Sequence, residues 1–237
     1  MARIISTPSG MVASSVQADA SLHANACLAE NAALRGDVER ARTSFSTLLA
    51  TRGLPSSTQA WLMTSLAELE QRDGRAEAAD VAFRAALKLD PDPYTTLAYA
   101  DFLIDQKRPL QALTVLKNQV RSDVVVLRLA IAGAQAGAPS AAADAAEMRE
   151  RISLANERPD AKIYHGREQA MFALVIDKQP KRALELARGN VAKQREPLDV
   201  LVLAQAARAS GEAEALQEAK RITQEMGLHD KRLQALL

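Results

Sequence analysis

The sequence contains few residues of the types that form catalytic or metal sites, and these residues are not spaced to form one. There are three histidines, His23, His165 and His229. A metal site needs at least three converging ligands and commonly uses two histidines three or four residues apart on one helix. These histidines have no such spacing, and the sequence therefore predicts no metal site.

Nucleophilic and acid–base chemistry also finds little support. The single cysteine, Cys27, lies among alanines, which predicts a small buried side chain rather than a reactive thiol. A single cysteine also excludes an intramolecular disulfide and a cysteine-based zinc site. The sequence contains no glycine-rich phosphate loop and no Gly-x-Ser-x-Gly turn. The polar cluster at 164–168 is either a ligand or acid–base site or the polar start of a helix. We expect no enzymatic activity and no cofactor.

Composition argues against two further classes of function. The chain carries 30 Lys and Arg against 29 Asp and Glu, a net charge of +1, whereas nucleic-acid-binding proteins carry a basic excess that neutralises phosphates. No apolar run approaches the roughly 20 residues that cross a bilayer. Alanine, the residue with the highest helix propensity, makes up 47 of the 237 residues. The composition favours an all-α protein that binds no nucleic acid and has no membrane span.

The first 20 residues are small and polar, with Pro8 and Gly10 among them. A secretory signal peptide requires a continuous apolar core of about 7–15 residues, which this segment lacks. We therefore expect a flexible leader over 1–20 and a cytoplasmic location. If the chain is part of a longer precursor with a signal peptide, the periplasm is the alternative location.

A repeating pattern of small, turn and large apolar residues runs along the rest of the chain. It is strongest in the segment 60–93, at Leu66, Ala67, Gly74, Ala79, Phe83, Ala86 and Pro91. This segment resembles a tetratricopeptide repeat (TPR), a helix–turn–helix unit of 34 residues. The same template recurs five more times, for instance upstream at Leu28, Ala29, Gly36, Ala41 and Phe45 and at the end of the array at Leu203, Ala204, Ala207, Gly211 and Leu216.

The physical roles of these positions predict the architecture. Small residues such as Ala67 and Ala79 let two antiparallel helices approach closely, and large ones such as Phe83 fill the space between hairpins. Glycines end the first helices in a left-handed conformation, and prolines replace that turn in the middle hairpins. The glycines are Gly36, Gly74, Gly137 and Gly211, and the prolines are Pro109, Pro139 and Pro180.

The resemblance covers about 21–225 and implies an all-α, right-handed α-solenoid of about six TPR-like hairpins. We expect a linker at 53–57 and one longer helix at 140–157. Residues 226–237 carry four leucines, Leu228, Leu233, Leu236 and Leu237. This segment is expected to form a C-terminal capping helix, because solenoids need their last apolar face covered.

In TPR proteins the first helix of each hairpin lines a concave groove. The resemblance, carried over position by position, places one row of residues near the start of these helices and a second row further along, with Asp105 adding one more carboxylate. The first row is His23, Trp61, Tyr94, Val124, His165 and Leu198, and the second is Glu30, Glu68, Asp101, Ile131, Phe172 and Gln205. The first three hairpins thus present aromatic and acidic residues, and the last three present mostly apolar ones.

This groove lacks the Lys, Arg and Asn residues with which some TPR domains hold a partner's C-terminal carboxylate. It should instead prefer an extended or helical segment with apolar anchors and some Lys or Arg. Trp61 and Tyr94 are of the types enriched at binding hot spots. Two alternatives stay open. Trp61 lies two residues before the usual tryptophan position, so it could pack within its own hairpin, and the acidic row could be an ordinary solvated face.

The resemblance implies a non-enzymatic protein–protein interaction module, an adaptor or scaffold that binds a partner peptide or helix in its concave groove. The alternative is a structural protein that self-associates as a homodimer through the terminal segment 227–237. An enzyme with a solenoid accessory region has no catalytic constellation to support it. A helical repeat that reads RNA would need a basic surface, whereas this groove is acidic.

Overall fold

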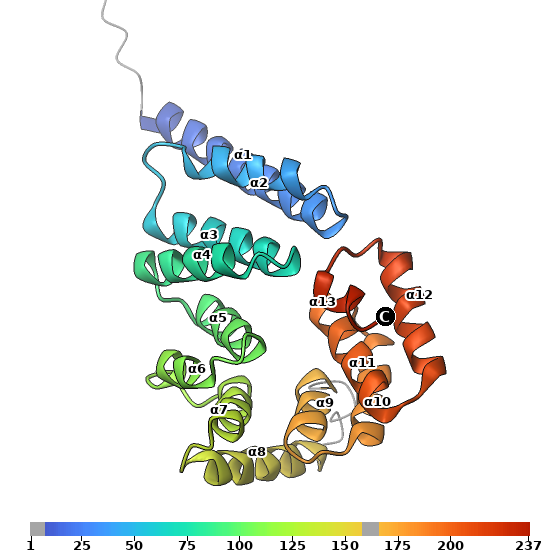
Figure 1. Ribbon diagram of the computed structural model, residues 1–237. Coiled ribbons are helices and arrows are strands. Elements are labelled where there is room, and N and C mark those ends of the chain that lie inside the picture. Colours follow the sequence, from blue (N-terminus) through green and yellow to red (C-terminus); the bar gives the residue numbers. More distant parts are fainter. Residues whose placement is uncertain (1–7, 158–165) are drawn as a thin grey trace, which may run out of the picture.

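The structure is a computed structural model that describes residues 8–157 and 166–237, with side chains from residue 20 onward. Within these residues all regular structure is helical (Figure 1). The helices are α1 (Pro8–Leu34), α2 (Val38–Leu49), α3 (Ser56–Arg72), α4 (Ala76–Leu89), α5 (Pro93–Asp105), α6 (Pro109–Leu116), α7 (Asp123–Ala136), α8 (Ala141–Asn156), α9 (Gly166–Val175), α10 (Pro180–Val191), α11 (Pro197–Ser210), α12 (Ala213–Met226) and α13 (Lys231–Gln234).

Consecutive helices of the described chain pair as six antiparallel hairpins, from α1 with α2 to α11 with α12, and each hairpin packs on the next. The expected all-α solenoid is confirmed. The linker at 53–57 overlaps the loop between α2 and α3, and the longer helix at 140–157 is α8. The small residues of the strongest repeat, Ala67, Ala79 and Ala86, are fully buried between α3 and α4, and so is Phe83.

The turns inside the hairpins use two chemistries. The four glycines expected at first-helix ends all have positive φ, between 63° at Gly137 and 89° at Gly36. In the third and fifth hairpins the left-handed position is held by Lys107 (φ 58°) and Lys178 (φ 54°), and a proline then begins the second helix. Pro139 departs from the expectation, because α8 begins two residues after it and Gly137 already closes that turn.

The N-terminal hairpin differs from expectation in two ways. Helix α1 begins at Pro8, so the segment expected as a leader is helical from residue 8 onward, and residues 1–7 lie outside the described part. Cys27, expected to be buried, is exposed, and its neighbour Leu28 is 67% exposed. In the described residues α1 packs against α2 and α3, and the part of its surface that carries Cys27 and Leu28 is left uncovered.

The array curves until its C-terminal end returns to its N-terminal half (Figure 1). The segment 227–232, here called the C-terminal strap, contacts the ends of three first helices. The His229 amide donates to the Leu34 carbonyl of α1 at 2.7 Å. Lys231 Nζ lies 3.0 Å from Asp73 Oδ1 at the end of α3. Arg232 Nη1 lies 3.3 Å from Asp105 Oδ2 at the end of α5.

The last residues cap the array in a form different from the expected helix over 226–237. Helix α12 runs to Met226, and only the four residues of α13 are helical beyond the strap's turn. Leu228 and Leu233 are buried in the core beside α11, whereas Leu237 stays 36% exposed. The leucines therefore cover the last apolar face, while the strap joins the two ends of the solenoid.

Candidate binding cavity

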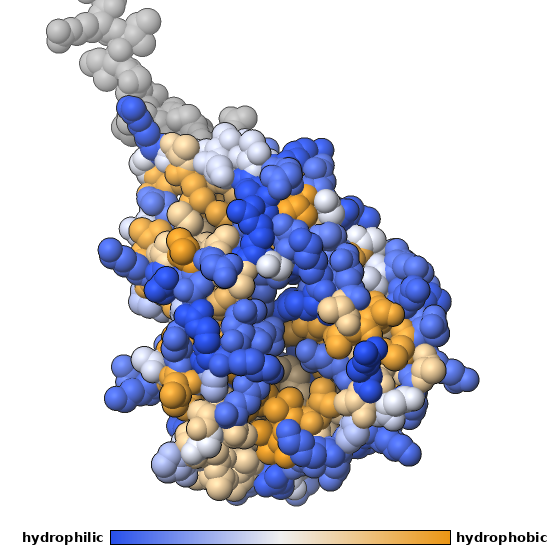
Figure 2. Space-filling model, viewed as in Figure 1, coloured by the Kyte–Doolittle hydropathy of each residue, from blue (hydrophilic) through white to orange (hydrophobic). Residues whose placement is uncertain are grey.

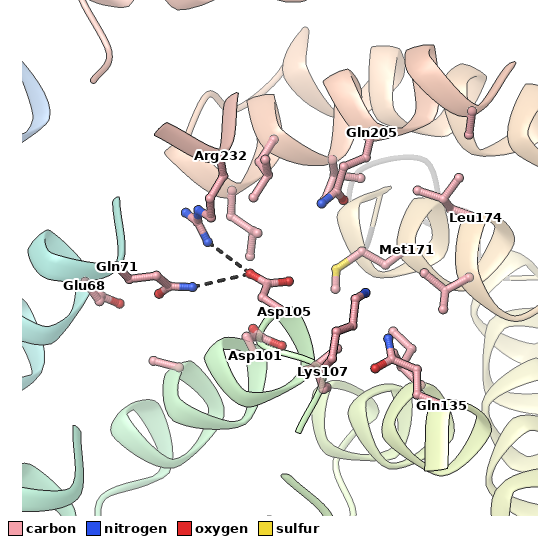
Figure 3. Close-up of a pocket in the computed structure, with 18 residues that line it drawn as sticks. Glu68, Gln71, Asp101, Asp105, Lys107, Gln135, Met171, Leu174, Gln205 and Arg232 are labelled. Atoms are coloured by element: carbon pink, nitrogen blue, oxygen red, sulfur yellow. Dashed lines mark hydrogen bonds and ion pairs between the residues drawn. The ribbon is translucent and has the colours of Figure 1, made fainter. Parts of the chain in front are cut away.

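The curvature and the strap enclose a cavity of about 390 Å³ on the concave side (Figure 3). Its lining comes from the first helices of the second to sixth hairpins, from Lys107 in the turn after α5, and from the strap. These residues are Glu68, Gln71, Ala98, Asp101, Ile104, Asp105, Lys107, Ile131, Gln135, Met171, Leu174, Val175, Leu198, Leu201, Val202, Gln205, Ala209 and Arg232.

Three carboxylates on α3 and α5, Glu68, Asp101 and Asp105, form what we call the acidic wall. Asp101 and Asp105 are four residues apart, which places both on one face of α5. The Tyr94 hydroxyl donates to Glu68 Oε1 at 2.7 Å. Arg128 Nη2 donates to Asp101 Oδ2 at 2.6 Å, and Arg128 is itself buried. Each carboxylate is thus held in place by a neighbouring first helix, by the strap, or by both.

Two carboxylates of this wall are incompletely compensated. Burial raises the pKa of Glu68, and the hydrogen bond from Tyr94 and the charge of Arg72 oppose that rise only in part. Asp105 keeps 36% of its side chain exposed, but desolvation at the cavity wall likewise raises its pKa, against the opposing charge of Arg232. Burial disfavours the ionised form of such a carboxylate, and a cation that approaches it favours that form again. The acidic wall is therefore electrostatically suited to a cationic group.

The opposite side of the cavity, here called the apolar wall, consists of Met171, Leu174 and Val175 on α9 and of Leu198, Leu201 and Val202 on α11. Leu201 and Val202 are each 2% exposed and belong to the core, whereas Met171, Leu174 and Leu198 are half-buried and offer surface to the cavity. Figure 2 shows a hollow at the centre of this face, with hydrophilic residues toward α5 and hydrophobic residues toward α9 and α11.

The structure brings together part of the expected groove. Glu68, Asp101 and Asp105 line the cavity, together with Ile131, Leu198 and Gln205 of the same two rows. Tyr94 does not line it, but its hydroxyl reaches Glu68, and the ring lies at a surface position that is 61% exposed. Glu30 on α1 is half-buried and its charge adds to the rise of the Glu68 pKa.

Other expected groove residues lie elsewhere. The rings of His23 and Trp61 stack with centroids 5.0 Å apart, and Trp61 packs half-buried against the core of the first two hairpins. Val124 is half-buried outside the cavity lining. His165 lies outside the described residues. For the described side chains, the expected aromatic row is therefore split between a packing contact and the outer surface.

Phe172 is a correction to the expected groove, because it is 2% exposed and packs in the core of the middle hairpins. The Arg149 guanidinium lies 5.4 Å from its ring centroid. Its neighbour Met171 faces the cavity instead (Figure 3). Successive helical residues are rotated by about 100°, so a shift of one position exchanges the core residue and the cavity residue on α9.

Several cavity residues were missed by the sequence expectations. Met171 and Leu174 would have been predicted if the repeat template had been shifted by one position on α9. Arg232 and Asp105 lie 127 residues apart in the chain, so no local pattern indicates their contact. Over the residues that the structure describes, no group of three His, Cys, Asp or Glu side chains could hold a metal ion. In that same part of the chain, every helix is too short or too polar to cross a bilayer.

No protein-family model matches the chain, and the comparison with curated proteins finds no match. Among solved structures the chain is similar to PilF of Pseudomonas aeruginosa, with a TM-score of 0.50 and 18% identity over 92% of this chain and 96% of that one. It is also similar to PilW, described as a widely conserved type IV pilus biogenesis factor, with a TM-score of 0.49 and 20% identity over 91% of this chain and 98% of that one. At these identities the likeness to PilF shows the fold alone, a TPR-like helical-repeat solenoid.

Proposed function

We propose that this protein is a non-enzymatic interaction module, a scaffold that docks a segment of a partner protein on its concave side. The observation that carries the proposal is the cavity, in which an acidic wall from α3 and α5 faces an apolar wall from α9 and α11. Concave sites with an apolar lining and a few convergent polar groups are the usual places of ligand binding.

The two walls also support a chemistry for the partner. A segment with apolar anchors and at least one Lys or Arg would place its apolar side chains on Met171 and Leu174 and its cation on Asp105. A partner with acidic residues at the same positions would meet the carboxylates of the acidic wall and be rejected. The proposed partner is therefore a protein or peptide of mixed apolar and basic character.

Capture of a partner from the source lysate, identified by mass spectrometry, tests the proposal with a matched pair of variants. Leu174→Gln introduces an amide into the apolar wall and should abolish capture. Leu154→Gln makes the same change at a position on α8 that is 56% exposed and lies outside the cavity, and it should leave capture intact. Circular dichroism and the thermal midpoint must match before the baits are compared. Equal capture by both variants would refute a cavity-based function.

Self-association through 227–237 is the less supported alternative. It requires the leucines of this segment at an interface, whereas Leu228 and Leu233 are buried within the chain. Light scattering coupled to size exclusion, across a wide concentration range, measures the mass directly. A location in the cytoplasm and the absence of nucleic-acid binding stay predictions, which cell fractionation and a binding measurement with RNA would test.

A further inference from the structure

The size of the cavity limits what can enter it, given the proposed function on which this inference rests. The cavity holds about 390 Å³ while the strap is in place. It therefore has room for one or two inserted side chains of a docked segment.

The chain itself already seats a guanidinium on the acidic wall. Arg232 reaches from the strap to Asp105, with Nη1 and Oδ2 3.3 Å apart, and Gln71 Nε2 donates to the same oxygen at 3.4 Å (Figure 3). Lys107 also lines the cavity, and its charge lowers the pKa of Asp105, but among the described residues Arg232 alone lies within ion-pair distance of Asp105. The carboxylate thus recognises a guanidinium in the geometry that the structure shows.

The contact between Arg232 and Asp105 is the weaker of the two that Arg232 makes. Asp230, whose side chain is fully buried, accepts from Arg232 Nη2 at 2.7 Å and from Nε at 3.0 Å. Asp105 is 36% exposed and Arg232 26% exposed. Arg232 therefore keeps its buried partner when Asp105 binds another cation, and the contact with Asp105 can exchange without leaving a buried charge unpaired.

The apolar wall lies across the cavity from this carboxylate, with the Met171 sulfur directed toward it and the Lys107 side chain between the two walls (Figure 3). We propose that the cavity takes a single arginine side chain of an extended partner segment, with the guanidinium on Asp105 and an adjacent apolar residue on Met171 and Leu174. The chain's own Arg232 competes with the partner arginine for Asp105. The C-terminal strap is thus part of the binding site and lowers its affinity.

Fluorescence anisotropy with pools of labelled extended peptides tests this inference on the full chain. Each pool has one fixed central residue, arginine or its neutral isostere citrulline, and randomised apolar flanks. The arginine pool should bind at least about tenfold more tightly, a difference of about 1.4 kcal/mol. Equal binding of the two pools, or no binding at millimolar peptide, would overturn the inference.

Three variants assign the effect to Asp105 and to the competition. Asp105→Asn should erase the preference for arginine. Asp123→Asn is the matched control, because Asp123 is 39% exposed, pairs with Arg151 and lies outside the cavity. It should keep the preference. Arg232→Lys retains a cation for Asp230 but lacks the guanidinium that contacts Asp230 and Asp105 together. Because it competes less for Asp105, it should tighten binding of the arginine pool several-fold. A preference that survives Asp105→Asn, or an affinity unchanged in Arg232→Lys, contradicts the proposal.

The proposed function and this inference fail in distinguishable ways. If Leu174→Gln loses the natural partner while the arginine pool shows no preference over citrulline, the scaffold function stands and the arginine site is wrong. If Leu174→Gln captures the partner as well as the Leu154→Gln control does, the cavity is not the docking site and both fall.

Discussion

The two walls of the cavity arise from equivalent helices of one repeat array, yet they have opposite character. The helices α3 and α5 present Glu68, Asp101 and Asp105, whereas α9 and α11 present Met171, Leu174 and Leu198. The residues between the helices of each hairpin are alike in both halves, with small buried alanines such as Ala79 and Ala183. The repeat pattern therefore sets the packing between helices, while the inward-facing positions differ from one repeat to the next.

The largest difference in stability is expected between the buried residue and the cavity-facing residue of α9. Phe172→Ala empties a buried site, and we expect a loss of about 4 kcal/mol in the free energy of unfolding. Met171→Ala, one residue earlier and half-buried, should cost about 1 kcal/mol but should weaken peptide binding. Urea unfolding of both variants measures the difference. Similar losses would mean that α9 is rotated relative to the described structure.

The next effect concerns the acidic wall as a structural element. Asp101→Asn removes the charge that compensates the buried Arg128, and we expect a loss of about 3 kcal/mol, because a buried charge is left without its partner. At the half-exposed pair of Asp123 with Arg151, Asp123→Asn should cost less than about 1 kcal/mol. Equal costs in urea unfolding would contradict the burial of Arg128.

The stability of the protein should depend on pH in opposite ways at Glu68 of the acidic wall and at Asp80, which joins the second hairpin to the third. The pKa of Glu68 is raised by burial. The free energy of unfolding is therefore highest with respect to this group at acidic pH, where Glu68 is protonated, and it falls as pH rises through the raised pKa. Glu68→Gln should therefore gain stability relative to wild type between pH 4 and pH 7.

Asp80 should behave in the opposite way. Burial opposes ionisation, but hydrogen bonds from Arg108 and Tyr99 lower the pKa of Asp80 overall, so its contribution is present at neutral pH and is lost as pH falls. The same surroundings raise the pKa of Tyr99, through burial and its hydrogen bond to Asp80, to about 12. Asp80→Asn should lose stability at pH 7 and recover toward wild type in acid. Thermal melts across this range check both signs, and parallel curves for the two variants would refute the contrast.

The smallest effect concerns the turns, which differ within each half. Lys178 holds a left-handed conformation at φ 54°, which is strained for a residue with a Cβ. Lys178→Gly should stabilise the protein by about 0.5–1 kcal/mol, and Gly137→Ala should destabilise it by about 1 kcal/mol. Gly137 has no neighbouring atom within 4 Å of an added Cβ, so the cost there is backbone strain alone. An unchanged free energy of unfolding in both variants would contradict the left-handed conformation at these two turns.

The acidic wall of the candidate site could be predicted from the sequence, whereas the residues that α9 contributes to the apolar wall and the position of Trp61 could not. The acidic wall followed from position within the repeat, since α3 carries the strongest repeat and the weaker match on α5 lies 33 residues after it. On α9 the repeat template places Phe172 in the groove, where the structure has its neighbour Met171. For Trp61 a single repeat does not decide between groove and core, because its stacking on His23 depends on how the first two hairpins meet.

The hairpins follow from the amino-acid sequence, because the contacts that form them lie within one repeat of about 34 residues, and the alanines, glycines and prolines act within that span. The closure of the array follows instead from long-range packing. The contacts of Leu34 with His229 and of Asp105 with Arg232 depend on small rotations summed over six hairpins. No local pattern of residues carries that sum, so the strap and the cavity it encloses emerge only when the whole chain is folded.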